Sequence, residues 1–443
     1  MTVSPARRSA FEILRRVEAE SAFASVLLAT LDANMREDDR ALCHELVLGV
    51  LRQRLWLDRS IELFGNRSAQ KLDLPVRLAL EIGLYQLRFL TRIPPSAAVN
   101  ESVNLVRASR VKSAAGFVNA VLRRATRDPI YDPATEIQDP IEKLSIETSH
   151  PRWLIERWVN AFGFDEAREF ARTNNQPAPA ALRLTARAQR DEQARKRIMP
   201  ELESASAELT PSKIVPGSWR VAGAGGVLRE LVDEGLIYLQ DEASQLLAHL
   251  LHVRPGHRVL DVTAAPGSKA THIGALAPEA TVVTGDIHPR RAKTLQRLAL
   301  KQDARIHVIQ HDATKPLPFS DESFDRVLLD APCSGTGTLR RHPEIRYRLA
   351  PEDILQLASQ QLLMLSNAAR VLRRGGRLIY STCSVEPEEN ERVVESFLAT
   401  HRELVKTPLN APTQLETPEG YVRTWPNRDG CDGFFIAGLE RRG

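Results

Sequence analysis

The chain has 443 residues, 43% of them hydrophobic and 26% charged, and 60 basic against 56 acidic residues give a formal net charge of +4. This length exceeds what a single hydrophobic core organises, and the composition is that of a globular rather than a disordered protein. No apolar run approaches the ~20 residues of a membrane-spanning helix, and the N-terminus lacks the apolar core of an export signal. We therefore expect a multi-domain cytoplasmic protein without membrane contact.

Cysteine usage agrees with that compartment. The four cysteines, Cys43, Cys333, Cys383 and Cys431, are scattered along the chain. Their spacing is not that of a disulfide framework, and it suits a reducing cytosol. Neither Cys333 nor Cys383 has a partner at CxxC spacing, so we predict no metal site.

Basic residues are concentrated in three segments. Residues 107–127 carry six Lys or Arg and no acid, residues 290–305 form a second basic row, and residues 339–348 read LRRHPEIRYR. Any one of them could be a solvated helix face, but three together favour contact with a nucleic-acid phosphate backbone. In the first segment we expect Arg123 and Arg124 to bind RNA.

The first 127 residues have a helical pattern. Apolar residues recur at three- and four-residue steps over 11–31, 41–57, 76–90 and 97–109. The sequence therefore predicts an all-α bundle for residues 1–127.

The next part of the chain changes character twice. Residues 128–143 hold three prolines among acidic residues and are predicted to be a linker. Residues 144–235 combine a helical stretch at 151–163 with strand-like stretches at 180–186 and 219–225. We interpret this part as a small α+β module that assists RNA binding.

From residue 236 to 443, short β-rich runs alternate with helical patterns. Strands are predicted at 257–262, 281–287, 305–312, 324–330, 377–383 and 433–440, and helices from 269, over 290–300, over 353–372 and from 388. This alternation predicts an α/β domain whose mostly parallel sheet is covered on both faces. In such domains ligands bind beyond the carboxyl ends of the strands.

The turn after the first of these strands consists of small residues. It reads TAAPGSK at 263–269, which is not the GxGxxG fingerprint of a dinucleotide site. Ala264, Ala265, Gly267 and Ser268 leave space for a ligand against the backbone, and Pro266 stiffens the turn.

Acidic residues end the next three strands: Asp286, Asp312 and Asp330. One such acid could be only a helix cap, but Asp286 lies 19 residues after Gly267, where a carboxylate commonly accepts the ribose hydroxyls of an adenosine cofactor. Carboxylates without a basic phosphate cradle suit a cationic cofactor, which favours S-adenosylmethionine. Lys269 could pair with the carboxylate of that cofactor or act on a neighbouring thiol.

Two cysteines are expected at the same edge of the sheet. Cys333 follows Asp330 by three residues, and Cys383 ends the fifth strand 50 residues after Cys333. A free cysteine is most often an inert buried residue, but two thiols beside a methyl donor permit covalent catalysis. One thiolate would add to carbon 6 of a pyrimidine and activate carbon 5, Asp330 would hydrogen-bond the ring, and the second thiol would assist release. On the residues alone, either cysteine qualifies as the nucleophile; a cysteine hydrolase would need a His partner, and none is apparent near Cys383.

The third basic segment directly follows Cys333. We expect Arg340, Arg341 and Arg346 to hold the RNA backbone beside a target base that is unpaired or flipped out.

Four motifs resemble those of the RNA cytosine-5 methyltransferases with two active-site cysteines: TAAPGSKATH, DAPCSGTGTLRRHPEIR, YSTCSVEPEENERVV and DGFFIAGLE. The stretches ALEIGLYQLRFLTRIPPSAAVNESVNLVR and GFVNAVLRR resemble the NusB-type RNA-binding domain. Together the two parts resemble bacterial members of the family that modify small-subunit ribosomal RNA. The resemblance implies a Rossmann-like, S-adenosylmethionine-dependent domain that methylates carbon 5 of a cytosine, in a monomer acting on free or early-assembly RNA.

The resemblance also implies residue roles. Cys383 would be the nucleophile and Cys333 would aid product release, whereas the Pro-Cys motif of DNA cytosine methyltransferases would indicate Cys333. Cofactor contacts are implied for Thr263, Ala264, Ala265, Pro266, Gly267, Ser268, Lys269, Asp286, Asp312 and Asp330. The family loop usually begins with Cys and has two glycines, so Thr263 and Ser268 should weaken cofactor packing at most.

A second hypothesis is an RNA-binding ribosome assembly factor with a vestigial catalytic half. The presence of both cysteines and all the strand-end acids argues against it.

Overall fold

The computed structural model describes residues 3–31, 35–128 and 131–443, so residues 129 and 130 of the expected linker lie outside the described residues. The chain divides into two compact units. Unit one comprises Met1–Pro177 and Leu339–Leu349, and unit two comprises Ala178–Thr338 and Ala350–Gly443.

Unit one is helical, as expected for the N-terminal part. Its helices are α1 (Pro5–Ala19), α2 (Ala24–Leu28), α3 (Glu37–Arg52), α4 (Arg54–Gly65), α5 (Leu74–Phe89), α6 (Pro95–Ala108), α7 (Ala115–Arg127), α8 (Pro140–Thr148), α9 (Arg152–Phe162), α10 (Phe164–Thr173) and α17 (Ile345–Arg348). Prolines at the first turn of α1, α5 and α6 help to start these helices, because a first-turn N–H has no intrahelical partner to lose.

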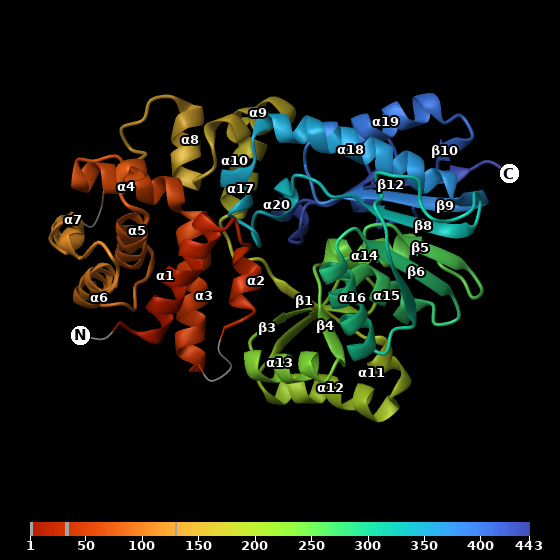
Figure 1. Cartoon of the computed structure of the whole chain (residues 1–443), viewed down its shortest axis with the longest axis horizontal. Helices are drawn as coiled ribbons and strands as arrows, with labels where there is room; N and C mark the ends of the chain where they lie inside the picture. Colours follow the sequence, from red (N-terminus) through yellow and green to blue (C-terminus); the bar gives the residue numbers. More distant parts are fainter. Residues whose placement is uncertain (1–2, 32–34, 129–130) are drawn as a thin grey trace. The chain divides into compact units, whose positions relative to one another are not determined.

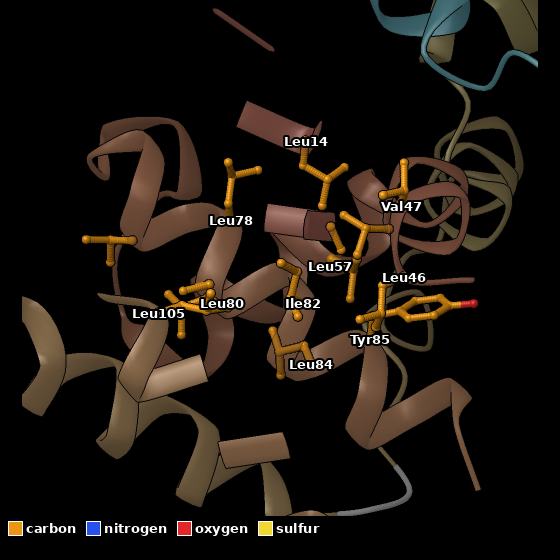
Figure 2. Packing of buried hydrophobic residues seen from close by; sticks show 14 of the residues in the cluster. Leu14, Leu46, Val47, Leu57, Leu78, Leu80, Ile82, Leu84, Tyr85 and Leu105 are labelled. Atoms are coloured by element: carbon orange, nitrogen blue, oxygen red, sulfur yellow. The ribbon is translucent and has the colours of Figure 1, made fainter. Parts of the chain in front are cut away.

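Helix α5 is the centre of this unit. It packs against α1, α3, α4, α6 and α7, and Figure 2 shows its Leu80, Ile82 and Leu84 within the apolar cluster. A side chain at Gly83 would lie only 2.7 Å from Leu122, so the glycine permits close approach of α5 to α7. The burial of α5 on nearly all sides explains why its sequence is more apolar than that of an ordinary surface helix.

The basic segment at 339–349 is a structural part of unit one. Arg346 is fully buried, and its guanidinium donates hydrogen bonds to the carbonyls of Thr148 and Ser149 (3.3 and 3.2 Å) and to Asn175 Oδ1 (2.9 Å). The Tyr347 hydroxyl donates to the carbonyls of Leu51 and Ser149 (both 2.9 Å). Arg348 donates to the carbonyls of Val17 (2.9 Å), Ser21 (3.0 Å) and Ala22 (2.7 Å).

Unit two begins with a small α+β module that contains the strand-like stretches predicted within 144–235, whereas the helical stretch at 151–163 of that prediction is α9 of unit one. Its elements are β1 (Ala180–Leu184), α11 (Ala186–Arg190), α12 (Glu192–Ser204), β2 (Glu208–Pro211), β3 (Ser218–Ala222), α13 (Gly225–Asp233) and β4 (Ile237–Leu239). The strands form an antiparallel sheet in the order β2-β3-β1-β4.

The rest of unit two is the expected α/β domain. Its elements are α14 (Glu242–Leu250), β5 (Arg258–Asp261), α15 (Ser268–Leu276), β6 (Thr281–Asp286), α16 (Pro289–Lys301), β7 (Ile306–Gln310), β8 (Phe324–Asp330), α18 (Pro351–Arg370), β9 (Leu372–Thr382), α19 (Glu391–Thr400), β10 (Leu404–Lys406), β11 (Val422–Arg423), α20 (Pro426–Asp429) and β12 (Phe435–Arg441). The strand order is β10-β12-β9-β8-β5-β6-β7, with β11 paired to β12. Strands β5 to β9 run parallel, whereas β12 pairs antiparallel to β9, so the sheet is mixed.

Two helical layers cover this sheet (Figure 1). Alternate residues of β9 point to opposite faces: Leu378 and Tyr380 join the cluster that contains α18 and α19, and Ile379 joins the one that contains α14. Burial on both faces explains why the strands are near-continuous apolar runs. The helix expected from residue 388 begins at Glu391, after a 3-10 turn at Pro387–Glu389. In the described part of the chain, no helix is long and apolar enough to cross a membrane.

The anchoring of Arg346 leads to a stability prediction. Arg346→Leu should lower the free energy of opening around α8 and α9 by about 2–4 kcal/mol, because buried carbonyls lose a charged donor. Hydrogen-exchange mass spectrometry on peptides from these helices measures it. Arg127→Ala, at an exposed position of α7, should change the same quantity by less than about 0.5 kcal/mol. Equal protection of wild type and Arg346→Leu would contradict the structural role.

Candidate active site

The carboxyl ends of three neighbouring strands bring the predicted chemistry together. Strand β5 ends at Asp261, β8 at Asp330, and β9 at Thr382, one residue before Cys383. Because β8 and β9 are parallel and Asp330 lies opposite Ser381, the residues that follow each strand emerge side by side. A backbone hydrogen bond from Ala331 N–H to the Ser381 carbonyl (2.8 Å) continues this register beyond the sheet.

The two predicted thiols are in direct contact. Cys333 Sγ and Cys383 Sγ are 3.3 Å apart, both residues are partly buried, and both are free thiols because a disulfide would hold the sulfurs at about 2.05 Å. The hydrogen bond with Cys383, burial, and the charges of Cys383, Glu389 and Asp330 raise the pKa of Cys333 well above its usual value. Cys333 therefore keeps its proton at neutral pH and can donate it toward Cys383.

Lys269 is paired with Asp330. Their side chains, Lys269 Nζ and Asp330 Oδ2, are 2.6 Å apart, and the other carboxylate oxygen accepts a hydrogen bond from the Ser381 hydroxyl (2.8 Å). Burial acts to lower the pKa of Lys269, but the interactions with Asp330, Asp261 and Cys383 outweigh it and raise that pKa. Lys269 is thus paired with Asp330, and the two partners considered from the sequence, a cofactor carboxylate and a neighbouring thiol, stay predictions.

Asp261 belongs to this group of charges and was not singled out in the sequence. It is fully buried. Burial raises the pKa of Asp261 to about 7, assisted by the charge of Asp330 and opposed by the charge of Lys269 and by a backbone hydrogen bond with Thr263. Its position at the end of the first strand of the α/β domain, in line with the other strand-end acids, was the signal that could have found it.

A cavity of about 490 Å³ opens beside the ends of β6 and β7. Its lining consists of Val262, Thr263, Asp286, Ile287, Arg291, His311, Asp312, Ala313, Thr314, Pro332, Gln360, Leu363 and Met364. Its size and its mixture of apolar walls with a few carboxylates suit an adenosine-sized ligand. Asp286 Oδ1 accepts the backbone N–H of His288 (2.9 Å), and Asp312 Oδ1 accepts the N–H and hydroxyl of Thr314 (2.9 and 2.6 Å), which lower the pKa of Asp312.

His311 is a second residue that sequence reasoning missed. It lies in the cavity lining and is buried. Burial lowers its pKa, while a backbone hydrogen bond with Val262 and the charges of Asp286 and Asp312 act in the opposite direction, and the lowered pKa leaves the ring neutral at physiological pH. A neutral imidazole in the lining can exchange hydrogen bonds with a polar ligand. The only sequence signal was its place directly before Asp312.

The predicted cofactor loop is arranged for close approach, although only Thr263 of its residues lines the cavity. Gly267 has φ +111°, a conformation that favours glycine, and a side chain there would lie 2.9 Å from Leu295. The Thr263 hydroxyl donates to the Asp330 carbonyl (2.8 Å), and the Ser268 carbonyl accepts from the buried Arg183 (2.9 Å). Thr263 and Ser268, the two residues that differ from the usual family loop, therefore both have hydrogen-bond partners within unit two.

The arginines predicted to bind RNA divide into two groups. Arg123 and Arg124 are exposed on α7, but Arg340 and Arg346 are buried within unit one, where Arg340 donates to the Pro177 carbonyl (2.9 Å). Arg341 is partly exposed. The guanidinium groups of Arg340 and Arg346 donate to protein carbonyls. We therefore assign Arg346 a structural role, and we do not propose an RNA contact for Arg340.

Comparison with known families assigns each part of the chain. Residues 4–127 match the NusB family, residues 150–227 match the ferredoxin-like domain of RsmF/B-like methyltransferases, and residues 248–440 match the family described as 16S rRNA methyltransferase RsmB/F. These matches and the sheet define the class as ribosomal RNA methyltransferases.

Curated relatives agree over the full length. The probable ribosomal RNA small subunit methyltransferase B of Bacillus subtilis is 33% identical over 100% of both chains. The probable methyltransferase B of Synechocystis is 34% identical over 98% of this chain and 99% of its own, and methyltransferase B of Sodalis glossinidius is 36% identical over 93% and 92%. The chain belongs to the ribosomal RNA small subunit methyltransferase B family.

Solved structures share the fold. The crystal structure of PH0851 matches 100% of both chains with a TM-score of 0.85 and 26% identity. A methyltransferase homologue from Pyrococcus horikoshii covers 69% of this chain and 100% of its own, with a TM-score of 0.59 and 23% identity. NSun6 from the same organism, crystallised with SFG, covers 66% and 98%, with a TM-score of 0.58 and 19% identity.

The buried Asp261 leads to a pH prediction. Its pKa in the folded protein, about 7, lies above the unfolded value near 4, so the folded state holds a proton that the unfolded state releases between these pH values. Stability contributed by this group therefore falls as pH rises toward 7. Asp261→Asn has no carboxyl group to titrate, so it should not lose this stability as pH rises. The difference between its free energy of unfolding and that of the wild type should therefore increase by about 2–4 kcal/mol from pH 5 to pH 8. Urea unfolding of both proteins across this range measures the difference, and parallel curves would contradict it.

Proposed function

We propose that this chain methylates carbon 5 of a cytosine in small-subunit ribosomal RNA, with S-adenosylmethionine as methyl donor and a covalent bond between Cys383 and carbon 6 of the ring. The single observation that carries this proposal is the pair of thiols 3.3 Å apart beside the Lys269–Asp330 ion pair, at the carboxyl ends of the strands. Membership of the ribosomal RNA methyltransferase family supplies the reaction class, and the thiol pair points to a base that requires covalent activation.

Cys383 is the better nucleophile of the two. Lys269, whose pKa is raised in part by Cys383, carries a positive charge close to that sulfur and favours a thiolate there, and Cys333 can be the hydrogen-bond donor to it. Attack by the Cys383 sulfur on carbon 6 forms the C–S bond and moves electron density to carbon 5. Asp330, held in place by Lys269 and Ser381, would accept a hydrogen bond from the edge of the cytosine ring.

The residues around the cavity fit the donor. Asp286 lies where the ribose hydroxyls of an adenosine group would be accepted, and Asp312, His311 and Ile287 line the space for its remainder. Bound S-adenosylmethionine would supply an electrophilic methyl group on a sulfonium. Asp286 and Asp312 are the carboxylates of the cavity lining that a cationic ligand could meet, and Arg291 Nε lies 3.4 Å from Asp286 Oδ2.

Cys333 completes the cycle. Once carbon 5 carries the methyl group, loss of its proton reforms the ring double bond, and the electrons of the C–S bond return to the Cys383 sulfur. The Cys333 thiol, 3.3 Å away, donates a hydrogen bond to the departing thiolate and lowers the barrier to its release.

Unit one supplies a surface for RNA. The basic residues of 107–127 are all exposed on and around α6 and α7: Arg107, Arg110, Lys112, Arg123, Arg124 and Arg127. No acidic residue interrupts them in the sequence, so they can neutralise several phosphates at once. We propose that this surface binds ribosomal RNA.

The function is tested with three proteins: wild type, Cys383→Ala and Cys333→Ala. Each is incubated with methyl-labelled S-adenosylmethionine and small-subunit RNA, and the product is analysed for 5-methylcytosine and for adducts that survive denaturing electrophoresis. We expect label in cytosine for wild type, neither label nor adduct for Cys383→Ala, and an accumulated adduct for Cys333→Ala. Bisulfite mapping of the RNA then locates the target base. Absence of label from cytosine with wild type would overturn the enzyme assignment, and exchanged phenotypes would reverse the roles of the thiols.

The RNA surface is tested separately. Arg123→Gln/Arg124→Gln should weaken RNA binding and reduce the slope of log K against log salt by about 1–2, since each lost phosphate contact contributes ~0.7–0.9. The control, Arg15→Gln/Arg36→Gln, makes the same change in net charge at a partly exposed position of α1 and at an exposed position before α3. Binding titrations at several salt concentrations compare the two, and equal slopes would remove α7 from the RNA interface.

A further inference from the structure

The carboxylate of Glu389 is hydrogen-bonded to both cysteine loops. Glu389 is fully buried at the end of the 3-10 turn Pro387–Glu389. Its Oε1 accepts hydrogen bonds from Ser334 N–H (2.8 Å) and Gln361 Nε2 (2.9 Å), and its Oε2 accepts from the hydroxyls of Ser384 (2.5 Å) and Ser334. Ser334 directly follows Cys333 and Ser384 directly follows Cys383, so one carboxylate is bound to the neighbours of both thiols.

The next residue extends this connection. Asn390 Nδ2 donates to the Ser384 carbonyl (2.9 Å), and Asn390 Oδ1 accepts from the Thr382 hydroxyl (2.5 Å). The residues on both sides of Cys383 are thereby held. The hydroxyl oxygens of Ser334 and Ser384 also lie 2.9 Å apart, so the two loops are in direct contact at this point.

Burying a carboxylate only to join two loops would be unfavourable in free energy. No ion pair to Glu389 exists within the described residues, so four hydrogen-bond donors must compensate the loss of water around a buried carboxylate. Burial raises the pKa of Glu389, and its hydrogen bonds with Ser334, Ser384 and Gln361 act in the opposite direction. A pair of apolar side chains could join two loops at lower cost, but it would not fix their separation as closely as several directional bonds do.

We propose that Glu389 is a positioning residue that sets the distance between Cys333 and Cys383 and so controls release of the covalent product. The inference rests on the proposed function, because it concerns the step in which the Cys333 thiol assists departure of the Cys383 sulfur. A hydrogen bond between two sulfurs weakens steeply with separation, so loosening either loop should impair release more than RNA binding.

Two substitutions separate geometry from charge. Glu389→Ala removes all four contacts. Glu389→Gln can keep them, because its amide oxygen can accept from Ser334 N–H and Gln361 while its amide nitrogen donates to the two serine hydroxyls, which can turn to accept. Ser384→Ala removes the hydroxyl's bond to Glu389 on the Cys383 side, together with its contacts with Ser334, Thr336 and the Glu386 N–H. Glu395→Gln, at an exposed position of α19, is the matched control.

Each variant is assayed for kcat, for KM toward RNA, and for the fraction of enzyme trapped as covalent adduct. We expect kcat of Glu389→Ala to fall by about 10–100-fold with adduct accumulation and with KM changed by less than about twofold, because small misplacements of reacting groups have effects of this size. Glu389→Gln should stay within about threefold of wild type, and Ser384→Ala should fall between the two. Glu395→Gln should match wild type.

Two results would overturn the inference: a wild-type adduct fraction in Glu389→Ala, or equal impairment of Glu389→Gln and Glu389→Ala. If Glu389→Ala does not fold, Ser384→Ala is used to test the inference. A wild-type adduct fraction in Ser384→Ala would then overturn it. A failure of the proposed function would look different, because wild type would then make no 5-methylcytosine and Cys333→Ala would trap no RNA.

Thiol geometry is also measured without RNA. Diamide, which accepts two electrons and two protons from a pair of thiols, should join Cys333 to Cys383 in the wild type, and peptide mass spectrometry gives the rate. We expect this rate to be at least about tenfold lower in Glu389→Ala than in wild type and near the wild-type value in Glu389→Gln, since close approach of the two sulfurs is required. Equal rates in all three proteins would mean that Glu389 does not set the separation.

Discussion

The parallel pairing of β8 with β9 is the constraint on which the site depends. Asp330 lies opposite Ser381 in this pairing, so the loops that carry Cys333 and Cys383 leave the sheet at the same level. The two cysteines are 50 residues apart in the sequence, yet their sulfurs are 3.3 Å apart. A shift of one residue in this register would turn alternate side chains to the opposite face of the sheet and separate the thiols. Burial of β9 between two helical layers resists such a shift.

One cation and two carboxyl groups surround the thiols. Lys269 is the cation of the group, and Asp330 is its direct partner, while the buried Asp261 is more easily protonated than an ordinary aspartate. The Lys269–Asp330 ion pair acts on Cys383, whereas the pKa of Cys333 is raised by its hydrogen bond with Cys383, by burial, and by the charges of Cys383, Glu389 and Asp330. In the proposed reaction the two cysteines perform different tasks because their surroundings differ, which is a general way in which a single residue type acts as both nucleophile and acid.

Sequence reasoning succeeded where chemistry follows the strands. Alternating apolar runs located the sheet, and the residues after each strand included Asp286, Asp330 and Cys383, because chain direction alone places such residues at one edge. It failed where the partner is a backbone group or lies far away in the sequence. Arg346 resembles an RNA-binding arginine in a basic run, and only the carbonyls of Thr148 and Ser149 reveal its anchoring role. Glu389 is similar: beside Glu388 in an acidic run it has no distinguishing mark, and only the fold turns it toward Ser334 and Ser384.

The segment at 339–349 has a consequence for synthesis on the ribosome. Unit one consists of residues up to Pro177 and of this segment, so its last piece emerges only after residues 178–338 have been made. At ~5–20 residues per second, that interval lasts roughly 8–32 seconds. During this time the carbonyls that later accept hydrogen bonds from Arg346, Tyr347 and Arg348 must be hydrogen-bonded to water. The helical unit therefore lacks these contacts until the segment has been synthesised. Unit one can therefore be completed only after the residues between Pro177 and Leu339, which belong to unit two, have been synthesised.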